Sequence, residues 1–152
     1  MTIANKKKIP QSYVLGFAFD YAHGGTRVAL ILKSKPDFQR NQFNGIGGHM
    51  ESYDASPVAA MVREFHEETN KKTQPVDWHQ FGILEREGVW IVFLYAAQLD
   101  SLNDARTSTS EPIIIHDMKN LPWNTLYNVR WLIPMARARL CGREEQYHVY
   151  EN

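Results

Sequence analysis

The stretch Arg63-Glu64-Phe65-His66-Glu67-Glu68 carries three carboxylates, at positions i, i+3 and i+4 of a predicted helix. At about 100° of rotation per residue, these three side chains fall on one stripe of the helix. Like charges repel each other there, so we expect a counter-charge. The counter-charge that suits carboxylate oxygens is a hard divalent cation such as Mg²⁺ or Mn²⁺. The stretch therefore predicts a metal site, and a phosphate group is the natural partner of such a metal.

The flanking residues predict a helix over residues 57–69. Ser56 suits the N-cap, and Pro57 suits the first helical position, where a missing N–H costs nothing. Asn70 tolerates the left-handed geometry with which helices often end. Arg63 lies four residues before Glu67 and can fix its rotamer through an ion pair. A second stripe at helical spacing supplies the packing face: Val58, Met61, Val62, Phe65 and Thr69.

A solvated, charged helix face is the alternative interpretation of the acidic string. It does not explain Gly47 and Gly48, one loop earlier, whose backbone can approach a ligand closely because no Cβ intrudes. Together these residues resemble the Nudix box, and the matching positions are Gly48, Asp54, Arg63, Glu64, Phe65, Glu67, Glu68 and Asn70. This sequence departs from the box in three ways. Eight residues separate Asp54 from Arg63 where the family has seven, Asp54 replaces a glutamate, and Asn70 replaces a glycine. The extra residue lies before the helix, so the role of Asp54 stays open.

The resemblance implies an α+β fold, in which a mixed β-sheet is sandwiched between α-helices. It also implies metal-dependent hydrolysis of a pyrophosphate bond in a nucleoside diphosphate linked to a further group. Carried over residue by residue, Glu64, Glu67 and Glu68 are the metal ligands, with the Gly47 carbonyl as a further donor and Arg63 orienting the acids. Glu111 stands where the family often places another acid, and it is a candidate base or ligand. The rival acids Glu85 and Glu87 are better interpreted as a charged hairpin tip.

The segment 43–48, Phe43-Asn44-Gly45-Ile46-Gly47-Gly48, resembles the MutT-like branch, which acts on oxidised purine nucleoside triphosphates. In that branch the asparagine contacts the base edge, which implies a substrate-binding role for Asn44 and its neighbour Phe43. An amide offers a donor and an acceptor side by side, as a purine edge requires. The alternative is that Asn44 and Gly45 only form a tight turn. His49 adjoins the glycine pair and can contact a phosphate.

Other substrates of the same machinery remain open, namely ADP-ribose, dinucleoside polyphosphates and other capped diphosphates. The proline typical of ADP-ribose hydrolases and the tyrosine typical of dinucleoside polyphosphate hydrolases are missing after the box, around Glu87. A catalytically silent nucleotide-binding module is the alternative of a different class. Trp90, Trp123, Tyr127 and Trp131 can stack on a base, but aromatic residues at such spacings are more often core, and we expect at most one in the pocket.

Composition is consistent with a single domain over residues 1–152. The 17 basic and 17 acidic side chains cancel, which favours a small nucleotide over a nucleic acid polymer. One cysteine, Cys141, excludes an internal disulfide. No apolar run is long enough to span a membrane, so a cytoplasmic protein is expected. A monomer or a homodimer is compatible with these features.

Hydrophobic patterning predicts the remaining elements. Strands are expected over residues 13–20 and 27–33, joined by a turn at residues 23–25, and a short segment over 46–51 follows. Further strands are expected over 78–86, 89–99 and 112–116, with the strongly apolar segment 89–99 at the centre of the sheet. Residues 100–110 form a polar loop, and residues 127–140 form a second packing helix.

Overall fold

The computed structural model describes residues 9–22 and 24–152. Its strands are β1 (Gln11–Ala22), β2 (Gly25–Leu32), β3 (Phe43–Asn44), β4 (Ile46–His49), β5 (Trp78–Arg86), β6 (Trp90–Gln98), β7 (Ile113–Asp117) and β8 (Tyr147–Tyr150). Its α-helices are α1 (Pro57–Thr69) and α2 (Tyr127–Leu140), and two short 3₁₀ turns, η1 (Asp37–Gln39) and η2 (Pro75–Asp77), complete the described elements. No helix in the described part of the chain is long and apolar enough to cross a membrane.

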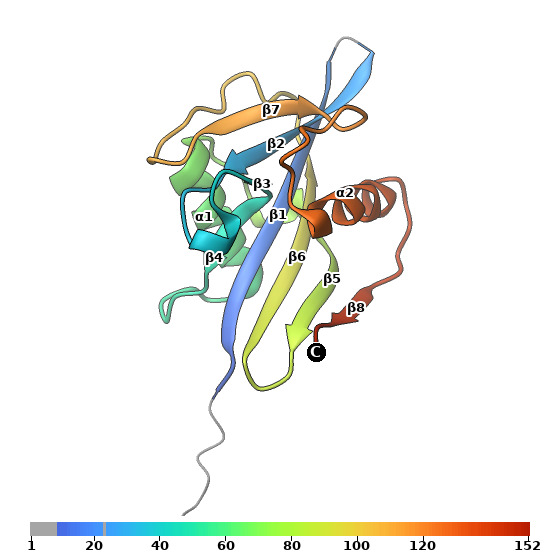
Figure 1. Cartoon of the computed structure of the whole chain (residues 1–152). Helices are drawn as coiled ribbons and strands as arrows, with labels where there is room; N and C mark the ends of the chain where they lie inside the picture. Colours follow the sequence, from blue (N-terminus) through green and yellow to red (C-terminus); the bar gives the residue numbers. More distant parts are fainter. Residues whose placement is uncertain (1–8, 23) are drawn as a thin grey trace, which may run out of the picture.

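The strands form one mixed sheet in the order β3-β2-β1-β6-β5-β8 (Figure 1). The long strand β1 pairs in parallel with β6, and its other edge pairs first with β4 and then with β2. β7 pairs with β2, and β8 pairs in parallel with the outer edge of β5. The predicted central position of the apolar strand is confirmed, since β6 lies between β1 and β5.

The two helices cover opposite faces of the sheet, as the alternation along β1 shows. Leu15, Phe17 and Phe19 point to the core beneath α2, whereas Val14 and Ala18 point to the core beneath α1. Figure 1 shows α1 and α2 flanking the central strands. The expected α+β architecture, a mixed sheet between helices, is therefore confirmed.

Helix α1 has the predicted bounds because its signals are local. The Ser56 side chain accepts a hydrogen bond from the Ala59 N–H (3.2 Å), and Pro57 opens the helix. Asn70 closes the helix with φ 55°, in the left-handed region. The helix buries Met61 and Phe65 against the sheet, and this fixes the direction in which its acidic stripe faces.

The sequence interpretation missed the C-terminal strand β8. It pairs with β5, more than sixty residues earlier in the chain (for example Gly82 with Tyr147), and nothing local signals that partner. The two-residue strand β3 and the turns η1 and η2 were also not expected. The predicted hairpin is present as the β1–β2 pair, although His23 of its turn lies outside the described residues.

Candidate active site

Arg63 connects the acidic residues of α1 to the loop that precedes the helix. Its Nη1 donates to Glu64 (3.1 Å) and to both carboxylate oxygens of Glu67 (3.3 Å each). Its Nη2 also donates to the His49 carbonyl at 3.0 Å. The structure thus brings together Arg63, Glu64 and Glu67 beside the end of β4, as the resemblance implied.

Asp54 holds the other side of the same guanidinium. Arg63 Nε and Nη2 donate to its two oxygens at 2.9 and 2.8 Å, which is the bidentate geometry of a strong pair. Asp54 also accepts from the Glu51 N–H at 2.8 Å, and its side chain is only 4% exposed. The hydrogen bonds from Arg63 hold the pKa of Asp54 below its usual value. The question left open by the sequence is answered structurally: Asp54 positions Arg63 despite the inserted residue.

Glu64 packs directly against Gly48. A Cβ added to Gly48 would lie 2.6 Å from Glu64 Oε1, so only glycine leaves room for this carboxylate. Burial raises the pKa of Glu64, even though Arg63 partly compensates. The glycine of the box therefore serves the packing of Glu64 against β4.

Glu67 and Glu68 differ in environment. The Glu67 side chain is 53% exposed, whereas Glu68 is half-buried and accepts a hydrogen bond from Thr109 Oγ1 at 3.3 Å. Burial raises the pKa of Glu68, with Lys33 acting in the opposite direction. The ionised forms of Glu64 and Glu68 are thus both disfavoured in the absence of a further cation.

The residues present fit a hard divalent cation in donor type. Within residues 9–22 and 24–152, no three His, Cys, Asp or Glu side chains converge in a preformed metal site. Arg63 donates to Glu64 and Glu67, and Thr109 donates to Glu68. The donor set is nevertheless all oxygen, and Arg63 and Lys33 only partly offset the burial of Glu64 and Glu68, which suits Mg²⁺ or Mn²⁺.

Gly47 lies opposite Leu15 in the register of β1 and β4. Only glycine fits at this position, because a Cβ would lie 2.0 Å from the Val14 carbonyl oxygen. The role of the Gly47 carbonyl as a further oxygen donor stays a prediction.

Glu111 is held tightly at the end of β2. It accepts from Lys33 Nζ at 2.7 Å and from the Ser34 N–H at 2.6 Å. Burial alone would raise its pKa, but the hydrogen bonds from Lys33 and Ser34 outweigh it and lower the pKa. A carboxylate kept ionised by a cation is a weak base, so this geometry favours a structural use of Glu111, which orients Lys33.

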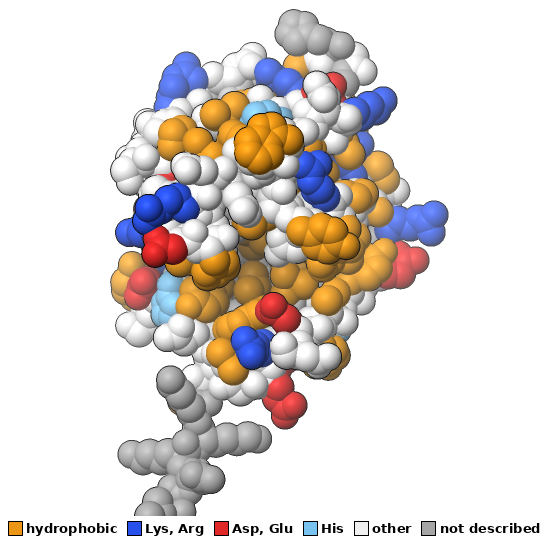
Figure 2. Space-filling view, viewed as in Figure 1, with side chains coloured by type: hydrophobic (Ala, Val, Ile, Leu, Met, Phe, Trp, Pro, Cys, Tyr) orange, Lys and Arg blue, Asp and Glu red, His pale blue; other side chains and the backbone are white. Residues whose placement is uncertain are grey.

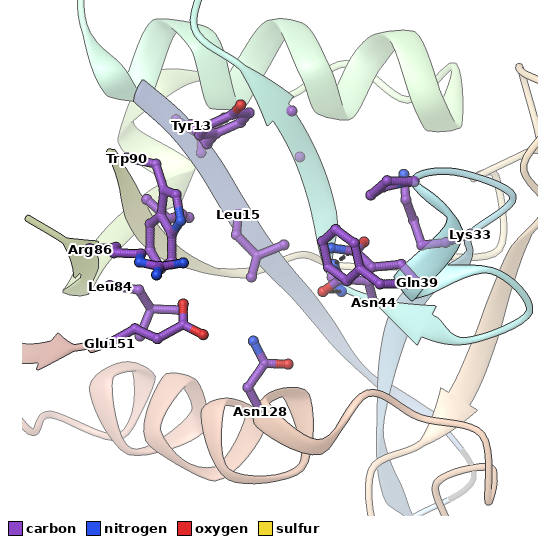
Figure 3. A pocket seen from close by; sticks show the side chains of 17 residues that line it. Tyr13, Leu15, Lys33, Gln39, Asn44, Leu84, Arg86, Trp90, Asn128 and Glu151 are labelled. Carbon is purple, nitrogen blue, oxygen red and sulfur yellow. Dashed lines mark hydrogen bonds between the residues drawn. The ribbon is translucent and has the colours of Figure 1, made fainter. Parts of the chain in front are cut away.

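A cavity of about 770 Å³ opens on the α2 side of the sheet, beside the glycine pair. Figure 2 shows this face hollowed, with mainly hydrophobic side chains in the hollow and charged ones around it. Its volume lies within the range of small-molecule sites. The residues that line it come from β1, the loop after β2, η1, β3, β4, β5, β6, α2 and the C-terminal segment. They include Tyr13, Leu15, Lys33, Gln39, Asn44, Gly47, Gly48, Leu84, Arg86, Trp90, Asn128 and Glu151 (Figure 3).

Only some of the predicted substrate-binding residues line the cavity. Asn44 and Gly48 line the cavity, but the Asn44 amide accepts from the Gly45 N–H (2.8 Å) and donates to Gln39 (3.3 Å). Phe43 is 6% exposed and packs edge-on against His116, away from the cavity. The ring of His49 packs edge-on against Tyr13 and does not line the cavity.

Sequence reasoning missed Lys33, Arg86, Asn128 and Glu151. They belong to four separate segments, and only the folded sheet brings them to one cavity. Among the four aromatic candidates, Trp90 lines this cavity and Trp131 packs against the core. The expectation that the other two are core residues is wrong, since Trp123 is 92% and Tyr127 is 84% exposed, around a shallower recess.

Comparison with known proteins places these features in a family. The model of the NUDIX domain matches residues 15–140. The NUDIX domain of Shewanella oneidensis NrtR, solved with ADP ribose, has a TM-score of 0.75 at 19% identity, over 92% of this chain and 99% of that chain. A NUDIX hydrolase from Nitrosomonas europaea has a TM-score of 0.72 at 16% identity, over 94% and 79% of the two chains.

The Ap4A hydrolase of C. elegans has a TM-score of 0.64 at 15% identity, over 87% of this chain and 99% of that chain. At these identities the structural likeness shows the fold. No curated protein matches the sequence. The family model, however, spans most of the 152 residues and includes the helix and the glycine pair described above. The chain therefore belongs to the Nudix hydrolase family.

Proposed function

We propose that this protein is a MutT-like enzyme that hydrolyses a purine nucleoside triphosphate, ordinary or oxidised, to the monophosphate and pyrophosphate. The observation that carries the proposal is the position of the acidic face of α1: Glu64 packs on Gly48, and Gly48 lines the nucleotide-sized cavity. A diphosphate group in the cavity would therefore lie beside the carboxylates.

In the proposed reaction, the oxygen of a water molecule attacks the α-phosphorus and gives up a proton to solvent. The anhydride P–O bond to the β-phosphate breaks, so that pyrophosphate leaves and the nucleoside monophosphate remains. Glu64, Glu67 and Glu68, with the Gly47 carbonyl, would hold Mg²⁺ or Mn²⁺. When bound, the ion supplies positive charge to the phosphoryl oxygens and lowers the pKa of a water ligand. Arg63, fixed by Asp54, keeps Glu64 and Glu67 oriented.

Lys33 supplies a positive charge to the phosphate end of the cavity. It lines the cavity and is held there by Glu111 at 2.7 Å. We assign Glu111 to this positioning and not to proton removal, because Lys33 Nζ and the Ser34 N–H already donate to its two carboxylate oxygens. The expected partner is a small nucleotide, and we propose that the enzyme acts in the cytoplasm as a monomer or a homodimer.

ADP-ribose is the second candidate substrate. It is supported by the length of the cavity, which the glycine pair helps to line and which extends from Lys33 at one end to Trp90 at the other (Figure 3). The NrtR NUDIX domain was solved with this ligand. Dinucleoside polyphosphates would place a second nucleoside outside the cavity, and a silent binding module would bind nucleotide without turnover.

The test is incubation with Mg²⁺ and a panel of ordinary and oxidised triphosphates, ADP-ribose and dinucleoside polyphosphates, with products identified by chromatography. We expect release of pyrophosphate from a purine triphosphate. Glu67→Gln and Glu68→Gln should each lower kcat at least about a hundredfold, because charge stabilisation of this kind contributes several kcal/mol. Glu145→Gln, at an exposed acid that does not line the cavity, is the matched control. Near-wild-type rates in both site variants would refute the assignment, and binding without turnover would favour the silent module.

A further inference from the structure

Three neighbouring strands place one residue each in a row at the end of the cavity opposite Lys33. Arg86 of β5 pairs with Trp90 of β6 in the sheet register. On its other side β5 pairs with β8, where Glu85 stands opposite Tyr150, so the next residue, Glu151, falls beside Arg86. The Glu151 N–H continues this ladder by donating to the Glu85 carbonyl at 2.8 Å. Figure 3 shows Trp90, Arg86 and Glu151 together at this end of the cavity.

The segment that carries Glu151 is built into the sheet edge. Gly82 permits the close approach of β8, because a Cβ there would lie 2.5 Å from the Tyr147 carbonyl oxygen. The His148 Nε2 lies 2.7 Å from Glu85 Oε2, which ties the two strands together a second time. Glu151 is therefore held at the cavity by its backbone, with only its side chain free to adapt.

The row presents two opposite charges and an aromatic ring to the same space. Within the described residues, neither Arg86 nor Glu151 takes part in an ion pair, although both line the cavity. A surface ion pair that forms intermittently would explain two adjacent charges, but not their position beside a half-buried Trp90 in a cavity. Asn128 of α2 faces the row from across the cavity (Figure 3).

This pattern matches one base. Guanine has two adjacent donors, N1–H and the 2-amino group, which a carboxylate can accept together, and O6 and N7, which an arginine contacts in bidentate fashion. Adenine offers one donor, the 6-amino group, beside the acceptor N1, so a carboxylate at this edge gains one hydrogen bond and faces the N1 lone pair. Cytosine and uracil each lack two adjacent donors. The ring of Trp90 adds a surface on which any base can stack.

We propose that Glu151, with Arg86 and Trp90, forms a base-selecting site for a guanine-type nucleotide. This deepens the proposed function and rests on it, since it assumes that the cavity beside α1 holds the nucleotide. Guanine and 8-oxoguanine share the N1–H and 2-amino donors, but 8-oxoguanine carries a hydrogen on N7 and so loses the bidentate contact with Arg86. The affinities for a guanine nucleotide and for an 8-oxoguanine nucleotide therefore show which of the two bases the site prefers.

The experiment is calorimetric titration of the full chain with GMP, 8-oxo-GMP, IMP and AMP, which requires no turnover. The wild-type protein should bind GMP or 8-oxo-GMP at least about tenfold more tightly than AMP, as expected for one bidentate contact. IMP, which lacks the 2-amino group, should fall between them. Glu151→Gln should lose at least about tenfold of the guanine preference and should bind IMP and GMP alike. Glu144→Gln, an exposed acid on the same C-terminal segment, should leave the preference unchanged.

The outcomes separate this inference from the proposed function. Guanine selectivity that depends on Glu151 supports the inference even if no triphosphate is hydrolysed, which would count against the function alone. Hydrolysis of triphosphates with equal binding of GMP and AMP would overturn the inference and leave the function intact. Unchanged selectivity in Glu151→Gln would also overturn it. A correctly folded variant is verified by an unaltered circular dichroism spectrum.

Discussion

Arg63→Ala should destabilise the protein more than any change at an exposed ion pair. Arg63 donates six hydrogen bonds, to Asp54, Glu64, Glu67 and the His49 carbonyl. Two of these partners have side chains only 4% and 11% exposed, so removal of the guanidinium leaves buried carboxylates without a counter-charge. Breaking a buried pair in this way costs about 3–5 kcal/mol.

The loss should lie near the lower end of that range. Asp54 keeps its hydrogen bond from the Glu51 N–H, and burial already raises the pKa of Glu64, so this carboxyl can take up a proton. For a chain of this size, a loss of about 3 kcal/mol corresponds to a decrease in Tm of about 6–12 °C.

The assay is thermal and urea unfolding followed by circular dichroism, with a chelator and with Mg²⁺. Arg40→Ala, which removes an exposed pair with Asp37, is the control and should cost no more than about 1 kcal/mol. Mg²⁺ should reduce the loss in Arg63→Ala, because the cation replaces part of the missing charge. A loss equal to that of the control would show that Arg63 does not organise the acidic face.

Three further changes test other parts of the structure. Glu64→Gln should raise the free energy of unfolding of the metal-free protein by about 1 kcal/mol at pH 7. Because burial raises the pKa of Glu64, this gain should disappear as the pH falls below the ordinary glutamate range. A gain that persists at that low pH would contradict burial as the cause. Asp20→Asn should lower the free energy of unfolding by about 3 kcal/mol near neutral pH. Burial opposes ionisation of Asp20, but the contacts with Arg27 lower its pKa overall, so the wild-type protein loses this stability as the pH falls through that lowered pKa. The urea midpoint of the variant should therefore change less between neutral and acidic pH than that of the wild-type protein. Gly48→Ala places a Cβ 2.6 Å from the Glu64 carboxylate and should weaken Mg²⁺ binding, measured by calorimetry, by about 10- to 100-fold; unchanged affinity would exclude Glu64 as a ligand.

The parts of the fold with local signals were predictable from the sequence. The bounds of α1 follow from Ser56, Pro57 and Asn70, which act within one turn of the helix. The contact of Arg63 with Glu67 follows from their spacing on the same helix. These features depend on neighbours in the chain, and hydrophobic periodicity locates the longer strands in the same way.

The parts that depend on distant partners were not predictable. Glu151 reaches the cavity only because β8 pairs with β5, and Lys33 is oriented by Glu111, 78 residues later. The motif spacing left Asp54 without a role, because a loop of one additional residue can still return a carboxylate to Arg63. Phe43 and Asn44 are adjacent in the two-residue strand β3, yet Phe43 is buried in the core beneath α2 and Asn44 lines the cavity, a division that only the folded sheet decides.

The sharing of β1 between β4 and β2 has a mechanical consequence. Because β1 is also bonded to β6 along nine residue pairs, the short strand with the glycine pair is joined to the most buried part of the sheet. A hinge movement of β4 alone would have to break its ladder to β1, and β1 itself is held in place by β6. We therefore expect the side chains on the outer strands and the η1 loop to adapt to ligands of different size. The acidic face of α1 should keep its position relative to the sheet.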